Sequence, residues 1–287
     1  MNEFEVLFDH GESPALQHDA YARYGKLGFP QPPGQRPWIY SNFVQSLDGI
    51  VSLKGRHAGG AAISQSQDDR WLMDLLRAHA DAVIVGVNTL VEETETGKRE
   101  RGPVFRIMAP DCRELRQALG RRREMNIIVT GAASLDLGAY RIFDGEYVDA
   151  VVVTTRKGAA RLAEKKSHPH VRVIASGEDQ FVDLPEVMGM LYRDLGIRHL
   201  LCEGGPTLYG YMAKAGLIDE KFITVSPVEV GQIVPPEQER TGDDSGNMRP
   251  TTFCAPGFVA GQEPHWTWLS CRKIASHQFS RYRRTSS

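Results

Sequence analysis

The sequence predicts an open α/β fold, with a mostly parallel central sheet, helices on both faces and an antiparallel hairpin near the end of the chain. Three observations lead to this class. Short apolar runs of strand length alternate with segments of helical periodicity. One run, residues 82–87, is apolar or glycine throughout, as is typical of a strand buried on both faces. Two strand-like segments, residues 265–272 and 275–283, are close enough in sequence to form a hairpin.

Regular structure is expected to begin at residue 38. Residues 1–37 are expected to form an N-terminal appendage that ends in an extended, proline-rich connector. Residues 38–44 alternate as a strand, and the glycine-containing segment 45–62 predicts a long loop of the kind that closes over ligands. Ser66 is the expected N-cap of the next helix, and His79 on its apolar face is interpreted as a packed side chain.

The rest of the chain continues the alternation. The expected strands lie at residues 82–87, 104–108, 126–130, 150–154, 171–174, 197–201 and 221–228, and the helical candidates at residues 112–119, 158–165 and 184–195. Residues 232–264 are rich in glycine, proline and charge, and predict an irregular insertion. Residues 38–284 are therefore expected to form a single domain.

The composition excludes several classes of function. The chain has 287 residues and a net charge of −2, which gives no electrostatic basis for binding nucleic acid or an anionic membrane. Its four cysteines form no C-x-x-C pair, and no H-x-E is accompanied by P-C-x-x-C, so neither a metal site nor a zinc deaminase is expected. Without a signal-peptide pattern or a membrane-spanning run, a cytoplasmic location is expected.

The most informative segment is Glu203-Gly204-Gly205-Pro206-Thr207, which lies between a predicted strand and a helix-like pattern. The glycines allow backbone N–H groups to approach a ligand, and the proline suits a first helical position. Thr207 adds a hydroxyl near the positive end of the helix dipole. These features favour a phosphate site, and an ordinary strand-to-helix turn is the alternative.

A second strand end, Gly86-Val87-Asn88-Thr89, has a similar composition. Ligands of open α/β sheets bind beyond the carboxyl ends of the strands, so two such loops predict a site that holds a diphosphate between them. A G-x-G-x-x-G segment does not follow the first strand, which disfavours an ordinary Rossmann domain.

Several segments share their order and residues with one family: Ser46-Leu47-Asp48-Gly49, residues 76–89, residues 201–208, residues 216–220 and Ser226-Pro227. Over residues 38–231 the chain resembles the pyrimidine reductase of riboflavin biosynthesis, a domain related to dihydrofolate reductase. The resemblance implies a dihydrofolate-reductase-like three-layer fold and a homodimeric, NADPH-dependent oxidoreductase. The family substrate is a phosphorylated ribosylamino-pyrimidine, whose sugar is reduced to a ribityl chain at C1′ of its open imine form.

The resemblance also assigns site residues. For the cofactor it implies Ser46, Gly49, Gly86, Thr89, Glu93, Gly204, Gly205 and Thr207, while Thr130, at another strand end, is a further candidate. Asp48 and Glu203 are expected to assist proton transfer, and Glu203 could also accept hydrogen bonds from pyrimidine amino groups. Arg77 and Arg99 are the candidates for the substrate phosphate, because a planar guanidinium suits bidentate contact.

The match is weaker on the substrate side. Ile50 replaces a lysine that is common in the family, and Ala62 and Glu92-Glu93-Thr94 also depart from its pattern. The sequence therefore leaves the substrate open. One alternative is a pterin or folate reductase, in which Asp68, spaced from Trp71 as in dihydrofolate reductases, would help to protonate the ring. Another is a non-catalytic protein that binds NADPH.

Overall fold

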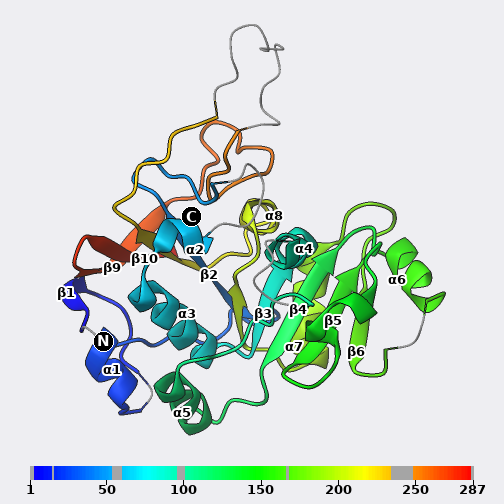
Figure 1. Cartoon of the computed structure of the whole chain (residues 1–287), viewed down its shortest axis with the longest axis horizontal. Coiled ribbons are helices and arrows are strands. Elements are labelled where there is room, and N and C mark those ends of the chain that lie inside the picture. Colours follow the sequence, from blue (N-terminus) through cyan, green and yellow to red (C-terminus); the bar gives the residue numbers. More distant parts are fainter. Residues whose placement is uncertain are drawn as a thin grey trace, which may run out of the picture.

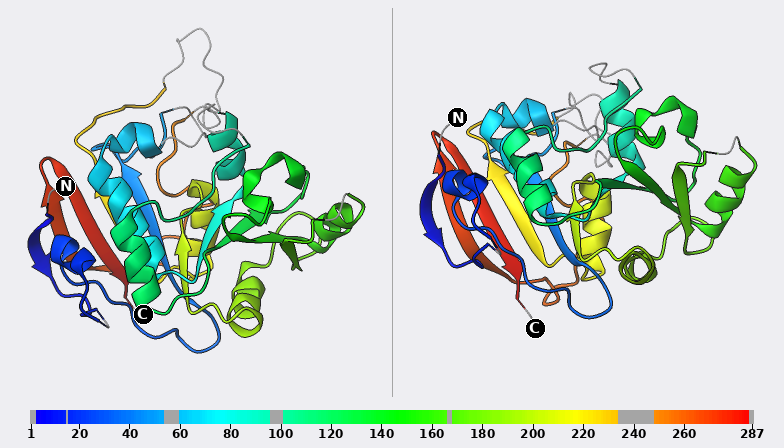
Figure 2. Two further views of the ribbon diagram at one scale, coloured as in Figure 1. Left: turned by 60° about the horizontal axis from the view of Figure 1, so that its bottom comes forward. Right: turned by 90° about the horizontal axis from the view of Figure 1, so that it is seen from below.

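The computed structural model describes residues 3–14, 16–53, 60–95, 101–165, 168–233 and 248–285. These residues build a ten-stranded sheet in the order β1-β9-β10-β8-β2-β7-β3-β4-β5-β6, with helices on both faces (Figure 1, Figure 2). The predicted α/β class, with its mostly parallel sheet, is confirmed.

Parallel strands make up the half of the sheet that carries the candidate site. They are β8 (Glu220–Val225), β2 (Trp38–Gln45), β7 (His199–Cys202), β3 (Ala82–Gly86), β4 (Met125–Thr130), β5 (Asp149–Thr154) and β6 (Val171–Ala175). Because each runs parallel to its neighbour, all their carboxyl ends lie at one edge of the sheet. Both glycine-containing strand ends, after β3 and β7, are therefore at this edge.

The other half of the sheet is antiparallel. β9 (Trp266–Ile274) and β10 (His277–Arg284) form the predicted hairpin, and β10 pairs with β8. β1 (Glu5–Asp9) adds to β9 as the edge strand. The hairpin prediction is confirmed.

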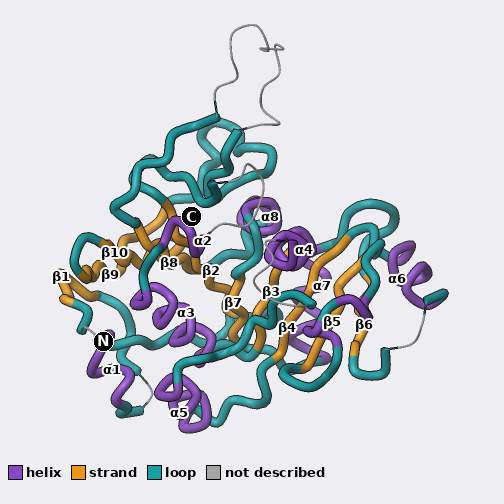
Figure 3. The backbone as a smooth tube through the Cα atoms, viewed as in Figure 1, coloured by secondary structure: helices purple, strands orange, loops and turns teal. Residues whose placement is uncertain are grey.

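Two helical layers cover the parallel strands (Figure 2, Figure 3). α3 (Gln67–His79) and α5 (Pro110–Ala118) pack on one face, and α7 (Leu184–Asp194) and α8 (Pro206–Lys214) pack on the other. Strand β3 is apolar throughout because both of its faces are covered. The remaining α-helices are α1 (Asp19–Tyr24), α2 (Gly60–Ser64), α4 (Val87–Glu95) and α6 (Arg156–Ala163).

Helix α3 begins as the sequence predicts. The Ser66 hydroxyl accepts hydrogen bonds from the N–H groups of Asp68 and Asp69, at 3.2 and 3.3 Å. At its other end, His79 is buried and its Nε2 lies 3.1 Å from the Tyr21 hydroxyl. Burial lowers the pKa of His79 to about 3, so the ring is neutral. The interpretation of His79 as a packed side chain is confirmed.

The N-terminal residues differ from the expected appendage. They contribute β1 to the sheet and α1 to the core, where the ring of Phe4 packs on those of Tyr24 and Phe279. The buried guanidinium of Arg272 donates to the carbonyl oxygen of Tyr24 at 2.7 Å and pairs with the carboxylate of Asp9. Arg272, 248 residues from Tyr24 in the sequence, therefore holds this segment against the sheet.

Residues 104–108 do not form the strand that their apolar composition predicts. Side chains bind the backbone of this segment where a neighbouring strand would otherwise do so. Asn126 accepts from the N–H of Phe105 at 3.0 Å and donates to its carbonyl oxygen at 2.8 Å. Glu124 accepts from the N–H of Ile107, and Asp74 accepts from those of Met108 and Ala109. The segment is held in place without joining the sheet.

Irregular segments border the carboxyl edge of the sheet. Residues 226–233 and 248–265 contain neither helix nor strand, and residues 234–247 lie outside the described residues. The guanidinium of Arg249 donates to the carbonyl oxygens of Leu53, Val230 and Gly231 at 2.8–3.1 Å. These bonds join the segment that follows β2 to the one that follows β8.

Candidate active site

The two glycine-containing strand ends lie against each other. The N–H of Glu203 donates to the carbonyl oxygen of Ile84 at 3.1 Å, which continues the pairing of β7 with β3 past its last register pair. A Cβ added to Gly204 would lie 2.8 Å from the Cα of Val85 and 2.9 Å from the backbone nitrogen of Gly86. Only glycine fits this approach of two backbones, and the predicted juxtaposition of Gly204 and Gly86 is present.

Helix α8 opens directly onto this junction. Gly205 is its N-cap residue and Pro206 follows, as predicted, with no side chain capping the helix. The first-turn N–H groups of an α-helix have no partner within the helix, and the end that carries them is positively polarised. The N–H of Gly205 is held by the hydroxyl of Thr89, at 2.9 Å. The chain thus presents a rigid glycine turn and an uncapped helix end to an anion, which fits the diphosphate of a nicotinamide nucleotide.

The end of β4 lies beside that of β3 at the same edge. Thr130 is buried, and its hydroxyl accepts from the N–H of Ala133 at 3.2 Å. The hydroxyl therefore stabilises its own turn, and Thr130 borders the glycine junction through the backbone.

A tight turn after β2 contains three of the predicted residues. The Ser46 hydroxyl is buried, donates to the Asp48 carboxylate at 2.6 Å and accepts from the N–H of Ile50 at 2.9 Å. Gly49 has a φ of +82°, which favours glycine. The three residues together define the shape of this turn beside the end of β2.

Asp48 is a clamp between two loops. Its carboxylate also accepts from the N–H groups of Val230 and Gly231, at 3.1 and 2.7 Å. The hydrogen bond from Ser46, followed by these backbone bonds, lowers the pKa of Asp48 to about 2. The group is ionised at neutral pH, which does not fit the expected role as a proton donor.

Arg77 and Glu203 lie together in the structure, where they form an ion pair with each other. Arg77 Nε donates to Glu203 Oε1 at 2.7 Å and Arg77 Nη2 to Oε2 at 2.6 Å. Arg77 Nη1 donates to the carbonyl oxygen of Arg106 at 2.8 Å and lies 3.5 Å from Asp74 Oδ1, while Nη2 also contacts the sulfur of Met73. The two side chains are only 10% and 6% exposed.

This pairing changes the expected roles of both residues. With all its N–H groups engaged inside the protein, Arg77 has none left for a substrate phosphate, so that assignment does not fit the structure. The carboxylate of Glu203 likewise serves as the counter-ion of a buried cation. The other phosphate candidate, Arg99, and the side chain of Glu93 lie outside the described residues.

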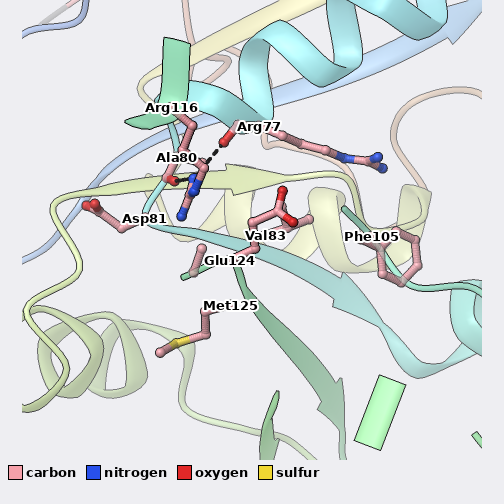
Figure 4. A pocket seen from close by; sticks show the side chains of 9 residues that line it. Arg77, Ala80, Asp81, Val83, Phe105, Arg116, Glu124 and Met125 are labelled. Atoms are coloured by element: carbon pink, nitrogen blue, oxygen red, sulfur yellow. Dashed lines mark hydrogen bonds between the residues drawn. The ribbon is translucent and has the colours of Figure 1, made fainter. Parts of the chain in front are cut away.

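Arg77 also lines a small cavity, which lies away from the glycine junction (Figure 4). The cavity is lined by residues at the amino ends of β3 and β4, among them Ala82 and Met125. Arg116 fills its wall and donates to the carbonyl oxygens of Arg77 and Ala80, at 3.0 and 2.6 Å. The glycine junction lies at the opposite edge of the sheet, so this cavity belongs to the core.

Two further positions bear on the substrate. Ile50, where the family commonly has lysine, is 1% exposed and packs into the interior. Asp68 pairs with Arg23 of α1 at 2.5 Å, and that guanidinium lies 4.0 Å from the centre of the Trp71 ring. Asp68 therefore faces α1 and not the edge of the sheet, which removes the observation that favoured a pterin reductase.

The neighbouring carboxylate, Asp69, is not among the residues that the sequence predicts for the site. Asp69 lies three and seven residues before Leu72 and Leu76, which are both buried under α3. This helical spacing places Asp69 on the inner face and was available in the sequence. The carboxylate of Asp69 is indeed buried, beside Thr224 of β8.

Comparison with known proteins identifies the family. The model of the RibD C-terminal domain family matches residues 37–256. The chain belongs to the RibD C-terminal domain family. It is 30% identical over 197 residues to the 2,5-diamino-6-ribosylamino-4(3H)-pyrimidinone 5′-phosphate reductase of Archaeoglobus fulgidus, covering 68% of this chain and 83% of that protein. The protein of the same name from Methanothermobacter thermautotrophicus is 27% identical over 197 residues, 68% of this chain and 80% of its own.

Solved structures agree with the family assignment at the level of the fold. A pyrimidine reductase-like protein from Corynebacterium diphtheriae aligns over 94% of this chain and 100% of its own, with a TM-score of 0.67 and 20% identity. RibD from Acinetobacter baumannii aligns over 88% of this chain and 59% of its own, with a TM-score of 0.59 and 20% identity. The predicted resemblance and its reductase fold are confirmed. Within the described residues, no helix has the length and apolarity that crossing a bilayer requires.

Proposed function

We propose that this member of the RibD C-terminal domain family is an NADPH-dependent reductase of a phosphoribosylamino-pyrimidine, which converts the ribosyl group to a ribityl chain. One observation carries the proposal: Gly204 and Gly86 form a backbone junction below the uncapped N-terminus of α8. The names of the relatives, which are pyrimidinone phosphate reductases, support the same substrate class.

The residues around the junction would hold the nucleotide. The N–H groups at the start of α8 and the Thr207 hydroxyl would bind its phosphates. Gly86 would leave room for the nucleotide at the edge of the sheet, while Gly204 allows the two backbones to approach. Thr89 fixes the orientation of Gly205 through its hydrogen bond. When bound, NADPH supplies the hydride. NADPH is proposed over NADH on the family resemblance.

The main contribution of the protein to the reaction would be to position the substrate against the nucleotide. Reduction at C1′ of the open imine form requires that substrate and nucleotide be aligned, and alignment of two bound reactants supplies a large share of many rate enhancements. The pKa of Asp48 is lowered to about 2, and both carboxylate oxygens of Glu203 accept hydrogen bonds from Arg77, so neither side chain is available to the substrate as a proton donor. We infer that the proton comes from water at the open edge of the sheet.

We also propose that the enzyme is a homodimer. The antiparallel half of the sheet keeps large apolar side chains exposed: Leu7 on β1 is 52% exposed, and Trp268 on β9, stacked on Tyr282, is 43% exposed. Exposed apolar surface of this kind favours association. Sedimentation equilibrium is expected to give twice the chain mass of 31.9 kDa, and a monomer at working concentration would refute it.

Turnover with a small substrate panel tests the function. The purified chain would be mixed with NADPH and either the diaminopyrimidinone substrate of the relatives, the corresponding aminouracil phosphate, or dihydrofolate. Loss of NADPH absorbance is expected with one of the two ribosylamino-pyrimidines and not with dihydrofolate, because Asp68 faces α1. NADPH binding without turnover of any substrate would instead support the non-catalytic alternative, and turnover of dihydrofolate alone would refute the proposal.

A further inference from the structure

Arg249 joins three segments of the chain at the carboxyl edge of the sheet. Its Nε donates to the carbonyl oxygen of Leu53 at 3.0 Å, and its Nη1 donates to those of Val230 and Gly231 at 3.1 and 2.8 Å. Leu53 belongs to the β2 loop, residues 46–53, and the other two residues follow β8. Arg249 itself lies in the irregular insertion, so this one side chain holds together segments that are far apart in the sequence.

Asp48 of the β2 loop binds the same two residues through their N–H groups. The Asp48 carboxylate accepts from Val230 and Gly231 at 3.1 and 2.7 Å. An anion therefore binds the N–H groups of this pair, and the cation of Arg249 binds its carbonyl oxygens. Hydrogen bonds with a charged partner are shorter and stronger than those between neutral groups. The two residues after β8 thus connect the charge of Asp48 to that of Arg249.

Backbone hydrogen bonds extend the contact between these segments. The N–H of Leu47 donates to the carbonyl oxygen of Val228 at 2.8 Å. The N–H of Val51 donates to the carbonyl oxygen of Pro250 at 2.9 Å. The β2 loop is therefore attached at several points along its length, and Arg249 attaches its far end.

The β2 loop lies beside the proposed cofactor junction. β2 is the neighbour of β7, and Ser41 is in register with Cys202, the last residue of β7. β2 continues for four residues beyond Ser41, to Gln45, whereas Gly204 lies only two positions beyond Cys202. The β2 loop therefore begins farther along the strand direction than Gly204. A nucleotide held at Gly204 that extends toward β2 would contact this loop.

The chemistry of the β2 loop suits one half of such a nucleotide. Hydrogen bonds from Ser46 and from backbone N–H groups lower the pKa of Asp48 to about 2, so the loop carries a negative charge at neutral pH. Leu47 is 63% exposed, which leaves an apolar side chain free to contact a ring. The adenosine half of NADPH carries an additional phosphate, which an anionic loop repels. The uncharged ring of the reduced nicotinamide is therefore the part expected at the β2 loop.

We propose that Arg249 is a positioning residue, which holds the β2 loop in the conformation that receives the nicotinamide end of the cofactor. The inference rests on the proposed function and gives the irregular insertion a part in it. A loop that already has its binding conformation adds no ordering cost when the ligand binds. If only a fraction of the molecules has this conformation, the apparent Kd rises by the inverse of that fraction. Arg249 acts through the loop, to which its Nε is bonded.

Matched arginines at the two edges of the sheet provide the test. Arg123 precedes β4 at the amino edge, and its Nη2 donates to the carbonyl oxygens of Gly145 and Glu146 at 2.8 Å each. Arg123→Ala, like Arg249→Ala, removes a guanidinium that binds backbone carbonyl groups of another segment. For both variants and for Arg249→Lys, the Kd values for NADPH and for its adenosine half, adenosine 2′,5′-bisphosphate, would be measured. The KM for NADPH, kcat and the melting temperature complete the set.

Arg249→Ala is expected to raise the Kd and the KM for NADPH about tenfold, which corresponds to the binding conformation in a tenth of the molecules. The Kd for adenosine 2′,5′-bisphosphate should not change, because this half lies away from the β2 loop. At saturating NADPH, kcat should stay within about twofold of the wild-type value, because bound nucleotide selects the ordered loop.

The other variants should bracket this result. In Arg249→Ala the insertion should stay in place, because the backbone N–H of residue 249 donates to Gln232 Oε1 at 2.8 Å. Arg249→Lys should give an intermediate Kd for NADPH, because an ammonium lacks the fork that reaches both loops. Arg123→Ala should bind both ligands as the wild type does.

A Kd for NADPH in Arg249→Ala within about twofold of the Arg123→Ala value would overturn the inference. So would an equal rise in the Kd for both ligands, which indicates a change that is not confined to the nicotinamide end. If the wild type binds no NADPH, or reduces no ribosylamino-pyrimidine, the proposed function fails and this inference fails with it. Binding and turnover by the wild type, with unchanged NADPH affinity in Arg249→Ala, overturn this inference alone.

Discussion

Arg77 on α3 and Glu203 at the end of β7 form a buried, two-bond ion pair directly before the glycine junction, with N–O distances of 2.7 and 2.6 Å. The pair joins a helix on one face of the sheet to the strand end that continues into Gly204. Its position indicates a supporting role, in which the charge of Arg77 fixes the path of the backbone that would receive the cofactor.

Removing either partner is expected to destabilise the fold. Glu203→Gln leaves the Arg77 cation buried with only partial compensation, so the free energy of unfolding should fall by about 3 kcal/mol. The double variant Arg77→Met/Glu203→Leu should recover much of this loss, because no charge is then buried. Urea unfolding of Arg77→Met, Glu203→Leu and the double variant forms a mutant cycle. Losses that simply add, or a Glu203→Gln protein of normal stability that fails to bind substrate, would instead place Glu203 in contact with the substrate.

The two glycines of the junction should respond differently to alanine. A Cβ on Gly86 would meet its nearest neighbour, the Cβ of Leu208, at 3.7 Å, which is an ordinary contact. Gly86→Ala should therefore fold normally and bind NADPH more weakly, because the methyl group enters the space of the ligand. Gly204→Ala would press on the backbone of Val85 and Gly86, and should lose about 1–3 kcal/mol of stability. Melting curves and NADPH titrations separate the two effects; a stable Gly204→Ala or a Gly86→Ala with wild-type affinity would contradict them.

Asp48→Asn tests whether Asp48 takes part in proton transfer. Because its pKa is about 2, Asp48 is ionised throughout the neutral range and should not shape the pH profile of kcat there. The variant is expected to keep the profile of the wild type. A lowered carboxyl pKa stabilises the folded wild type fully at pH values above 3.8, and this stabilisation is lost as pH falls toward about 2. The variant should therefore be less stable than the wild type above pH 3.8, and the difference should shrink below it. If the Asp48→Asn variant lost a transition in the pH profile of kcat in the neutral range, Asp48 would again be a candidate for proton transfer.

His79 is expected to make the fold sensitive to acid. Its pKa falls from 6.5 to about 3 on burial, so the unfolded chain binds a proton over this range and the folded chain does not. The free energy of unfolding should therefore decrease as pH falls from 6.5 toward about 3. Urea unfolding at several pH values is expected to show a smaller decrease for His79→Gln. The exposed His265→Gln is the control and should follow the wild type; equal slopes in all three proteins would be inconsistent with a buried neutral His79.

Local features were predictable from the sequence. The glycine junction and the start of α8 depend on neighbours in the chain, namely an apolar strand, two glycines and a proline, and the structure has them where the pattern places them. The partner of Glu203 was not predictable in this way. Arg77 is 126 residues distant, and the pairing depends on how α3 lies across β7.

The other differences have the same physical origin. Residues 104–108 carry the composition of a strand, but the groups that bind their backbone are the side chains of Asn126, Glu124 and Asp74. The N-terminal segment lacks a long apolar pattern, and its position depends on buried arginines in β9 and β10. Neither set of partners can be read from the segment itself.

The central claim is that the junction of Gly204, Gly205 and Gly86 binds a reduced nicotinamide nucleotide. The most direct measurement is a fluorescence titration of NADPH against the wild type and Gly205→Val, whose side chain would meet the Thr89 hydroxyl at 3.0 Å and occupy the opening of α8. Saturable binding by the wild type, weakened more than about tenfold in a variant that melts as the wild type does, is the predicted result. An equal Kd for the two proteins, or no binding to the wild type, would contradict the account.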